Sequence, residues 1–189
     1  MQALLRLSAL IDALNGWVGR AVSWLILAIV LISAGNAVVR KVLDVSSNAW
    51  LELQWQLFAV VFMLGAAWTL LANEHIRIDI VNSMLRPRAR NIIDIIGHAF
   101  FLLPLTIIMM ITGYPFVLRS LRLNEQSMNA GGLPQWPAKL LVPLGFFLLF
   151  VQGVSEIIKR VAVMRGLIPD PHAASGTAEG AAPGHATLQ

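Results

Sequence analysis

Few side chains in this 189-residue sequence could carry out chemistry, and they do not cluster. There is no cysteine, so disulfides, thiolate nucleophiles and cysteine-ligated metal or iron–sulfur centres are excluded. Of the four histidines only His98 falls in an apolar stretch, so no second histidine can complete a haem site between facing helices. There is also no nucleotide-binding P-loop motif. We therefore expect a protein that is not an enzyme and has no cofactor, no metal and no catalytic residue.

Four stretches of the chain contain no charged side chain: residues 21–39, 53–72, 95–118 and 140–155. With their flanks they approach the roughly 20 helical residues that cross the hydrocarbon core of a bilayer. The mean hydropathy is +0.71, and charged residues make up only 13% of the chain, about half the share of an ordinary soluble domain. The sequence therefore predicts an all-α membrane protein with four transmembrane helices.

We divide the chain into three parts. Residues 1–19 carry an apolar stripe at helical spacing, which predicts an amphipathic segment lying along the membrane interface. Residues 20–166 form the four-helix membrane domain, and residues 167–189 are expected to be a disordered tail because they are rich in Ala, Gly and Pro. The stripe consists of Leu4, Leu7, Ile11, Leu14 and Val18. The predicted spans are residues 21–42, 51–73, 92–119 and 138–160.

The third predicted span is the longest of the four. Its pattern continues from residue 88 to residue 121, which exceeds what a bilayer requires and predicts a tilt or a protruding end. Pro104 and Pro115 lie within it and should each produce a kink.

The basic residues indicate how the helices are oriented. They flank the apolar stretches instead of forming a basic domain, which argues against nucleic acid as a partner. If all four stretches cross the membrane, nine bases lie on the side of the termini and five on the other, so the positive-inside rule predicts cytoplasmic termini. The nine are Arg6, Arg20, Arg77, Arg86, Arg88, Arg90, Lys159, Arg160 and Arg165, and the five are Arg40, Lys41, Arg119, Arg122 and Lys139.

Two groups of polar residues next to the second span have alternative explanations. Glu52 and Gln56 share a helical face. The Glu52 carboxylate either interacts with the positive, N-terminal end of its own helix dipole or makes a buried contact with another subunit. Residues 74–79 alternate polar and apolar side chains. They form either an internal turn closed by salt bridges or a contact with a partner or with lipid headgroups.

Six short motifs, in order between the four apolar stretches, carry a family resemblance. They are LELQW at 51–55, LGAA at 64–67, NEHIRID at 73–79, EQS at 125–127, GGLPQWPAK at 131–139 and PLGF at 143–146. Taken together, the chain resembles the small DctQ-type membrane subunit of the tripartite ATP-independent periplasmic (TRAP) transporters. The start of helix two and the Gly-Gly-Leu-Pro loop look most like the branch labelled mannitol/chloroaromatic.

The resemblance implies a non-catalytic role in a bacterial inner membrane. In that family an ion gradient drives uptake of an organic acid, which a periplasmic binding protein captures and a large multi-helix subunit transports. The small subunit is expected to scaffold the large one, to help dock the binding protein and to contact membrane lipid. An alternative from another class is a stand-alone four-helix protein that forms a homo-oligomer or binds a hydrophobic ligand.

The resemblance also selects candidate contact residues at the two kinds of interface. Those expected to face the large subunit are Glu52, Gln56, Glu74, His75, Arg77 and Asp79. Those expected to dock the binding protein are Arg119, Arg122, Glu125, Ser127 and Trp136.

Overall fold

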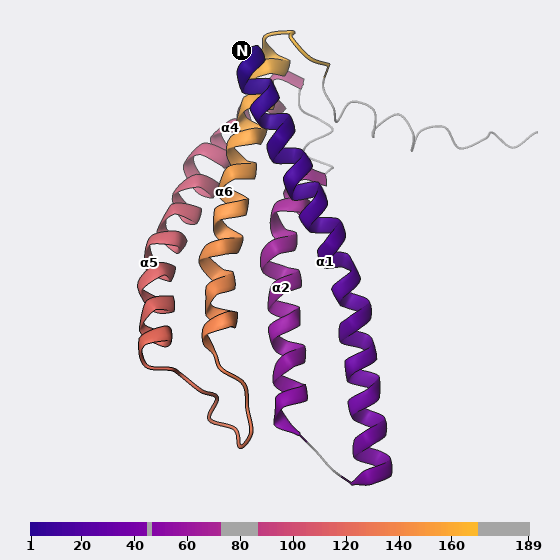
Figure 1. Ribbon diagram of the computed structural model, residues 1–189. Coiled ribbons are helices and arrows are strands. Elements are labelled where there is room, and N and C mark those ends of the chain that lie inside the picture. Colours follow the sequence, from indigo (N-terminus) through magenta and orange to yellow (C-terminus); the bar gives the residue numbers. More distant parts are fainter. Residues whose placement is uncertain (45–46, 73–86, 170–189) are drawn as a thin grey trace, which may run out of the picture.

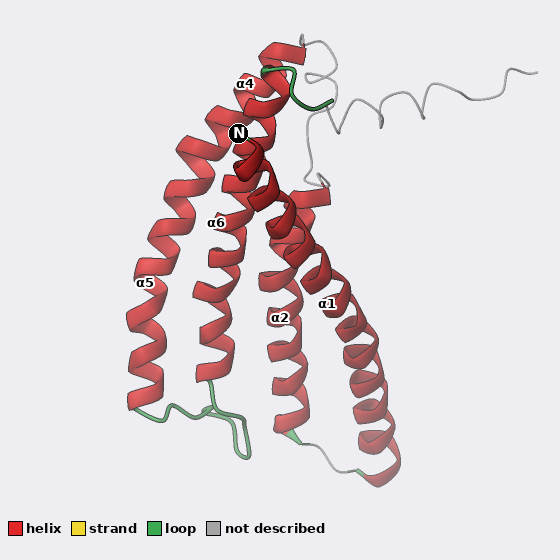
Figure 2. Cartoon of the chain, turned by 45° about the horizontal axis from the view of Figure 1, so that its top comes forward, coloured by secondary structure: helices red, strands yellow, loops and turns green. Residues whose placement is uncertain are grey.

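The computed structural model describes residues 1–44, 47–72 and 87–169. These residues form α1 (Gln2–Leu43), α2 (Asn48–Ala72), α4 (Pro87–Gly97), a π-helical turn η1 (His98–Leu102), α5 (Leu103–Arg122) and α6 (Trp136–Met164). Four helices are long and apolar enough to cross a membrane, with α4, η1 and α5 counted as one run from Arg88 to Arg122. Within the described ranges there is no strand, and loops occupy only the helix ends (Figure 2). The predicted all-α class is confirmed.

Helix α6 lies at the centre of the bundle (Figure 1). It contacts α1, α2, α4 and α5, whereas α1 packs mainly on α2 and α6. We call the end that carries residues 123–135 the loop end, and the opposite end, where α1 begins and α6 finishes, the terminal end. Because α6 begins at the loop end, residues that contact α6 there are connected through it to the other helices.

Helix α1 continues through residue 19, where the sequence predicted a boundary. It is one continuous helix of 42 residues, so the predicted boundary between an interfacial segment and the first span coincides with no break in the backbone. The helix ends where Asp44 adopts a left-handed conformation with φ 53°. The positive charges of Arg40 and Lys41 in its last turn interact favourably with the negative end of the helix dipole.

The third predicted helix is one run, from Arg88 to Arg122, that changes its helix type part-way along. The turn His98–Leu102 is π-helical, and the N–H of Leu103 bonds to the carbonyl of His98, five residues earlier. Pro104 follows directly; it has no N–H to donate and its ring crowds the carbonyls before it, which explains a widened turn at this point. Pro115, in contrast, lies inside the continuous helix α5. A kink was expected at Pro104, and the observed response is a local change of helix type.

Small residues bring the helices close together, as is typical of membrane bundles. Gly19 of α1 lies against the side chain of Trp68 in α2, where a methyl group would overlap the indole. A Cβ at Gly145 of α6 would lie 2.6 Å from the carbonyl oxygen of Met63. These two contacts set how closely α2 approaches α1 and α6.

The polarity of the bundle is reversed relative to a soluble protein. Its largest fully buried side chains are polar: Gln152, Asn15, Thr106, Ser8, Ser120 and Ser155. Bulky apolar side chains lie on the outside, with Trp24 and Phe100 each more than 70% exposed. Such a surface suits hydrocarbon, and hydrogen bonds between polar side chains help to hold the helices together.

Candidate functional site

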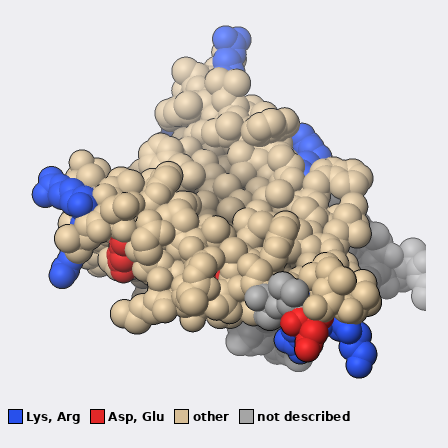
Figure 3. Space-filling model, turned by 60° about the horizontal axis from the view of Figure 1, so that its bottom comes forward, with Lys and Arg blue, Asp and Glu red and all other residues tan. Residues whose placement is uncertain are grey.

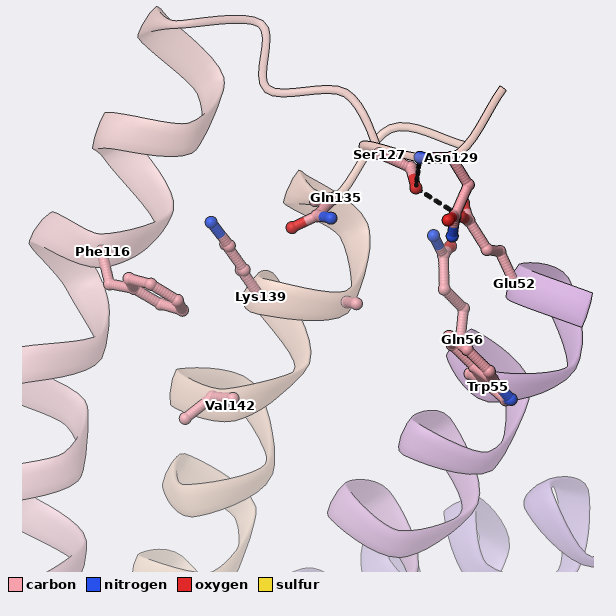
Figure 4. Close-up of a pocket in the computed structure, with 10 residues that line it drawn as sticks. Glu52, Trp55, Gln56, Phe116, Ser127, Asn129, Gln135, Lys139 and Val142 are labelled. Carbon is pink, nitrogen blue, oxygen red and sulfur yellow. Dashed lines mark hydrogen bonds between the residues drawn. The ribbon is translucent and has the colours of Figure 1, made fainter. Parts of the chain in front are cut away.

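The carboxylate of Glu52 organises the loop end of the molecule. Its Oε1 accepts hydrogen bonds from the Ser127 hydroxyl and, at 2.8 Å, from the Asn129 amide. Its Oε2 accepts the backbone N–H of Leu133 at 2.6 Å. Glu52 is only 7% exposed, and these three donors compensate a charge that would be costly to bury alone. Figure 4 shows Glu52 reaching from α2 toward Ser127 and Asn129.

The loop itself, residues 123–135, folds back as a narrow hairpin-like turn. The N–H of Ser127 bonds to the Leu133 carbonyl at 3.2 Å, and the N–H of Gln135 bonds to the Glu125 carbonyl at 3.0 Å. At Gly132 an added Cβ would lie 2.7 Å from Glu52 Oε1 and 2.5 Å from Ser127 Cβ. The glycine therefore lets the loop backbone approach the carboxylate.

Two more side chains of α2 hold this loop. Gln56 donates to the Pro134 carbonyl at 3.0 Å, and Asn48 donates to the Ala130 carbonyl at 3.1 Å. Asn48, Glu52 and Gln56 are spaced four residues apart and so lie on one face of α2. We call these three residues the α2 clamp. Asn48 was not among the sequence candidates, although its spacing from Glu52 was a usable signal.

Lys139 fixes the other side of the loop. Its ammonium group forms an ion pair with Glu125. The same group lies 4.4 Å from the centre of the Phe116 ring in α5, and Figure 4 shows both of these side chains. The hydrogen bond from Lys139 lowers the pKa of Glu125 below its ordinary value. Lys139 was not among the predicted contact residues, so its role as an anchor for the loop comes from the structure.

Glu52, Gln56 and Lys139 border a shallow pocket of about 340 Å³ between α2, α5 and α6. Trp55, Phe116 and Val142 supply its apolar lining. Among the described residues, no group of three or more His, Cys, Asp or Glu side chains could hold a metal ion. His98 bonds through Nδ1 to the Asp94 carbonyl at 2.6 Å.

The structure brings together four of the predicted contact residues and separates the others. Glu52 and Gln56 of α2 contact the loop that carries Glu125 and Ser127. Arg119 and Arg122 lie in the last turn of α5 and are exposed, while Trp136 begins α6. Four candidates, Glu74, His75, Arg77 and Asp79, lie outside the described residues. Contacts of any of these with other subunits remain predictions.

A family comparison covers most of this architecture. The sequence model described as "Tripartite ATP-independent periplasmic transporters, DctQ component" matches residues 29–163, which is more than two thirds of the chain and includes part of every long helix. The chain belongs to the DctQ family. Among curated proteins and among solved structures, none matches the chain significantly.

Membership of the DctQ family gives the chain a role at a coarse level. It is a multi-pass membrane protein and the small permease subunit of a TRAP transporter. The family is a transporter component and not an enzyme class. Because the system is tripartite, membership implies a large membrane subunit and a substrate-binding protein as partners.

The terminal end of this DctQ protein contains a second polar cluster, which joins α1 to α6. Asn15 donates to Gln152 Oε1 at 2.7 Å, and Gln152 donates to Asp12 at 2.9 Å and to Glu156 at 3.0 Å. Lys159 pairs with Asp12 at 3.0 Å and with Glu156 at 2.5 Å. Ser8 and Ser155 extend the cluster through a 2.7 Å hydroxyl contact. We call these seven residues the polar seam.

The seam determines which side chains of the first half of α1 are buried. Ser8 and Asn15 are buried together with Ile11 of the predicted apolar stripe, while Leu4, Leu7 and Leu14 of that stripe are 46–51% exposed. The polar side chains of this segment therefore meet α6. The α1 residues of the seam precede the part of the chain that matches the DctQ family, whereas its α6 residues lie within that part.

A further bridge ties α4 to α6 at the terminal end. Arg160 donates to Asn91 Oδ1 at 3.0 Å and lies 3.2 Å from Asp94 Oδ2. Arg160 is only 4% exposed, so this pair of partners compensates a buried guanidinium. The bridge and the seam together make α6 the hub of the DctQ bundle.

Proposed function

We propose that this DctQ subunit is a non-catalytic scaffold for the large membrane subunit, and that its loop end helps to dock the periplasmic binding protein. The observation that carries the proposal is the clamped loop. Three side chains of α2 and one of α6 contact residues 125–135 through hydrogen bonds and an ion pair. A loop ordered in this way loses little conformational entropy on binding, which favours recognition of a partner.

Exposed charge beside the loop supports docking. Arg119 and Arg122 project from the end of α5, next to a small pocket lined by Pro115, Leu118 and Leu123. Figure 3 views the loop end and shows charged side chains gathered at its rim, around a largely uncharged surface. Guanidinium groups at such a rim suit acidic side chains on a soluble partner, and they would mainly raise its rate of association.

Docking at this end requires the loop end to face the periplasm, so both termini would be cytoplasmic. The bias of nine bases to five supports this orientation. We further propose a location in a bacterial inner membrane and ion-gradient-driven uptake of an organic acid. The specific mannitol/chloroaromatic branch stays a prediction from the sequence motifs.

A double substitution tests the docking role. In proteoliposomes that contain the complete transporter, R119A/R122A should reduce uptake that depends on the binding protein, while the large subunit still co-purifies with the chain. The transported probe is the ligand identified by mass spectrometry in the purified binding protein. The matched control is R6A/R165A, which removes two exposed arginines at the terminal end. Unchanged uptake by R119A/R122A would remove these arginines from the docking surface.

The scaffold role is tested by purification. The chain, tagged at its C-terminus, should recover a stoichiometric large membrane subunit from native membranes in mild detergent. Recovery as a monodisperse homo-oligomer, without a larger partner in several detergents, would support the stand-alone alternative instead.

A further inference from the structure

We propose that the loop-end halves of α1 and α2 form a binding site for one phospholipid, with its phosphate held by Arg40 and Lys41. The inference concerns a surface between α1 and α2, formed by other side chains of α2 than those that hold the loop, and does not depend on which side of the membrane the loop end faces. It rests on two adjoining cavities, on the charge at their mouth and on the length of the apolar groove.

Helices α1 and α2 diverge toward the loop end (Figure 1). Two cavities lie between them there and share Asn36 in their lining. One has a volume of about 400 Å³, and the other has a volume of about 490 Å³. A methyl group added at Gly35 would meet no atom within 4 Å, so the backbone of α1 itself is open to this space.

The two cavities differ in chemistry. The first is lined by Leu31, Ile32, Gly35, Val39 and Trp50 together with Asn36, and is therefore largely apolar. The second is lined mainly by polar and charged side chains, including Ser33, Asn36, Arg40, Lys41, Asp44 and Gln54. An apolar groove beside a polar pocket is the pattern that an acyl chain and its headgroup require.

The polar cavity favours an anion. Its two cations exceed its one carboxylate, Asp44. In the described parts of the chain, Arg40 and Lys41 form no ion pair, and the Asn36 and Gln54 amides form no hydrogen bond, so their donors are uncommitted. Arginine and lysine are the usual phosphate ligands in proteins.

The groove also has a suitable length. From Leu31 to Arg40 the helix rises about 14 Å, at 1.5 Å per residue. This distance is close to half of the roughly 30 Å hydrocarbon core, which is the depth of one leaflet. With the Arg40 guanidinium at the level of the lipid headgroups, the apolar cavity would extend toward the middle of the bilayer and accommodate an acyl chain. A soluble phosphate ester would use only the polar cavity, so the apolar one favours a lipid.

The test is native mass spectrometry of the full-length chain, titrated with dioleoylphosphatidylglycerol in mild detergent. One lipid should remain bound at collision energies that remove the others. R40Q/K41Q should lower the retained fraction at least about fivefold, whereas R119Q/R122Q, which removes an equal charge at the end of α5, should leave it unchanged. Equal loss in both variants would indicate unspecific attraction to charge and would overturn the site.

The apolar part is tested with a variant that keeps every charge. Gly35→Leu should fill the groove and lower lipid retention, while Gly65→Leu, also at a glycine with open space in a membrane helix, should not. Circular dichroism confirms that each variant folds. Unchanged retention in Gly35→Leu would exclude the groove.

Two further measurements separate the occupants. sn-Glycerol 3-phosphate at millimolar concentration should not displace the lipid; displacement would indicate a site for the phosphate alone. In the purified transporter, R40Q/K41Q should keep the large subunit bound. Loss of that subunit with unchanged lipid retention would assign this surface to a protein partner and overturn the proposal.

Discussion

The carboxylate of Glu52 and the backbone N–H of Leu133 lie 2.6 Å apart, although 81 residues separate them in the chain. This contact joins the start of α2 to the loop that connects α5 with α6. The loop therefore moves with α2 and not only with the helices that it connects. Since Lys139 ties the same loop to α6, any shift of α2 relative to α6 would be transmitted to the surface proposed for docking.

Replacing Glu52 with Gln should release the loop. A neutral amide can accept fewer hydrogen bonds than a carboxylate, and its NH₂ group would oppose one of the donors from Ser127, Asn129 or Leu133. We expect amide hydrogen exchange at Leu133 to accelerate at least about tenfold, because buried donors without a partner are costly. Gln54→Glu offers a control with altered charge two residues away. Unchanged exchange in E52Q would show that the carboxylate does not hold the loop.

Gly132 should tolerate no side chain, whereas its neighbour should tolerate one. In Gly132→Ala the new methyl would overlap Ser127 and the Glu52 carboxylate, and such overpacking costs about 1–3 kcal/mol. Gly131 has φ 71° but open space around it, so Gly131→Asn, which accepts a left-handed backbone, is the matched control. Limited proteolysis of the loop should be faster in G132A alone. Equal cleavage of G132A and wild type would contradict the close approach at Glu52.

The loop should also loosen in acid, through Glu125. Its pKa lies below the ordinary value of 4.5 because Lys139 donates a hydrogen bond to the carboxylate. A group whose pKa is lowered by folding stabilises the fold above its unfolded pKa, and this contribution disappears as the pH falls through the folded value. Exchange of the Gln135 amide, corrected for the intrinsic effect of pH, should be constant from about pH 7 to 5 and increase below about pH 4.

Two variants check this assignment. Glu125→Gln should reduce the acid step, whose remainder comes from the Glu52 carboxylate that holds the same loop, and Lys139→Met should give a looser loop at every pH. If E125Q keeps the same step, another group is responsible for it.

Much of the fold could be predicted from the sequence, because the length of each uncharged stretch depends only on neighbouring residues and can be read directly. The predicted spans 51–73 and 138–160 agree closely with α2 (Asn48–Ala72) and α6 (Trp136–Met164). The π turn before Pro104 was not predicted, since a proline indicates a disturbed helix but not the form that the disturbance takes.

The contacts of the candidate site were less predictable. The four-residue spacing of Glu52 and Gln56 established a common face, but spacing within one helix does not identify a partner on a loop more than 70 residues away. The same limit applies to the polar seam. Asp12 and Lys159 each look like a charge at the membrane surface, and only the packing of α1 on α6 makes them a pair.

The seam gives the last prediction, which concerns how α1 is held. Asn15 and Gln152 are both at most 1% exposed and bond at 2.7 Å. Hydrogen bonds between membrane helices contribute about 0.6–2 kcal/mol, so a double-mutant cycle of Asn15→Ala and Gln152→Ala should give a coupling energy in that range. The measurement is unfolding in mixed micelles of increasing denaturing detergent. Thr112→Val is the control, because Thr112 is exposed and bonds only to the Ile108 carbonyl of its own helix. If the losses of unfolding free energy in N15A and Q152A simply add, the hydrogen bond between these residues does not stabilise the bundle. The apolar packing of α1 on α2 would then hold α1 in place.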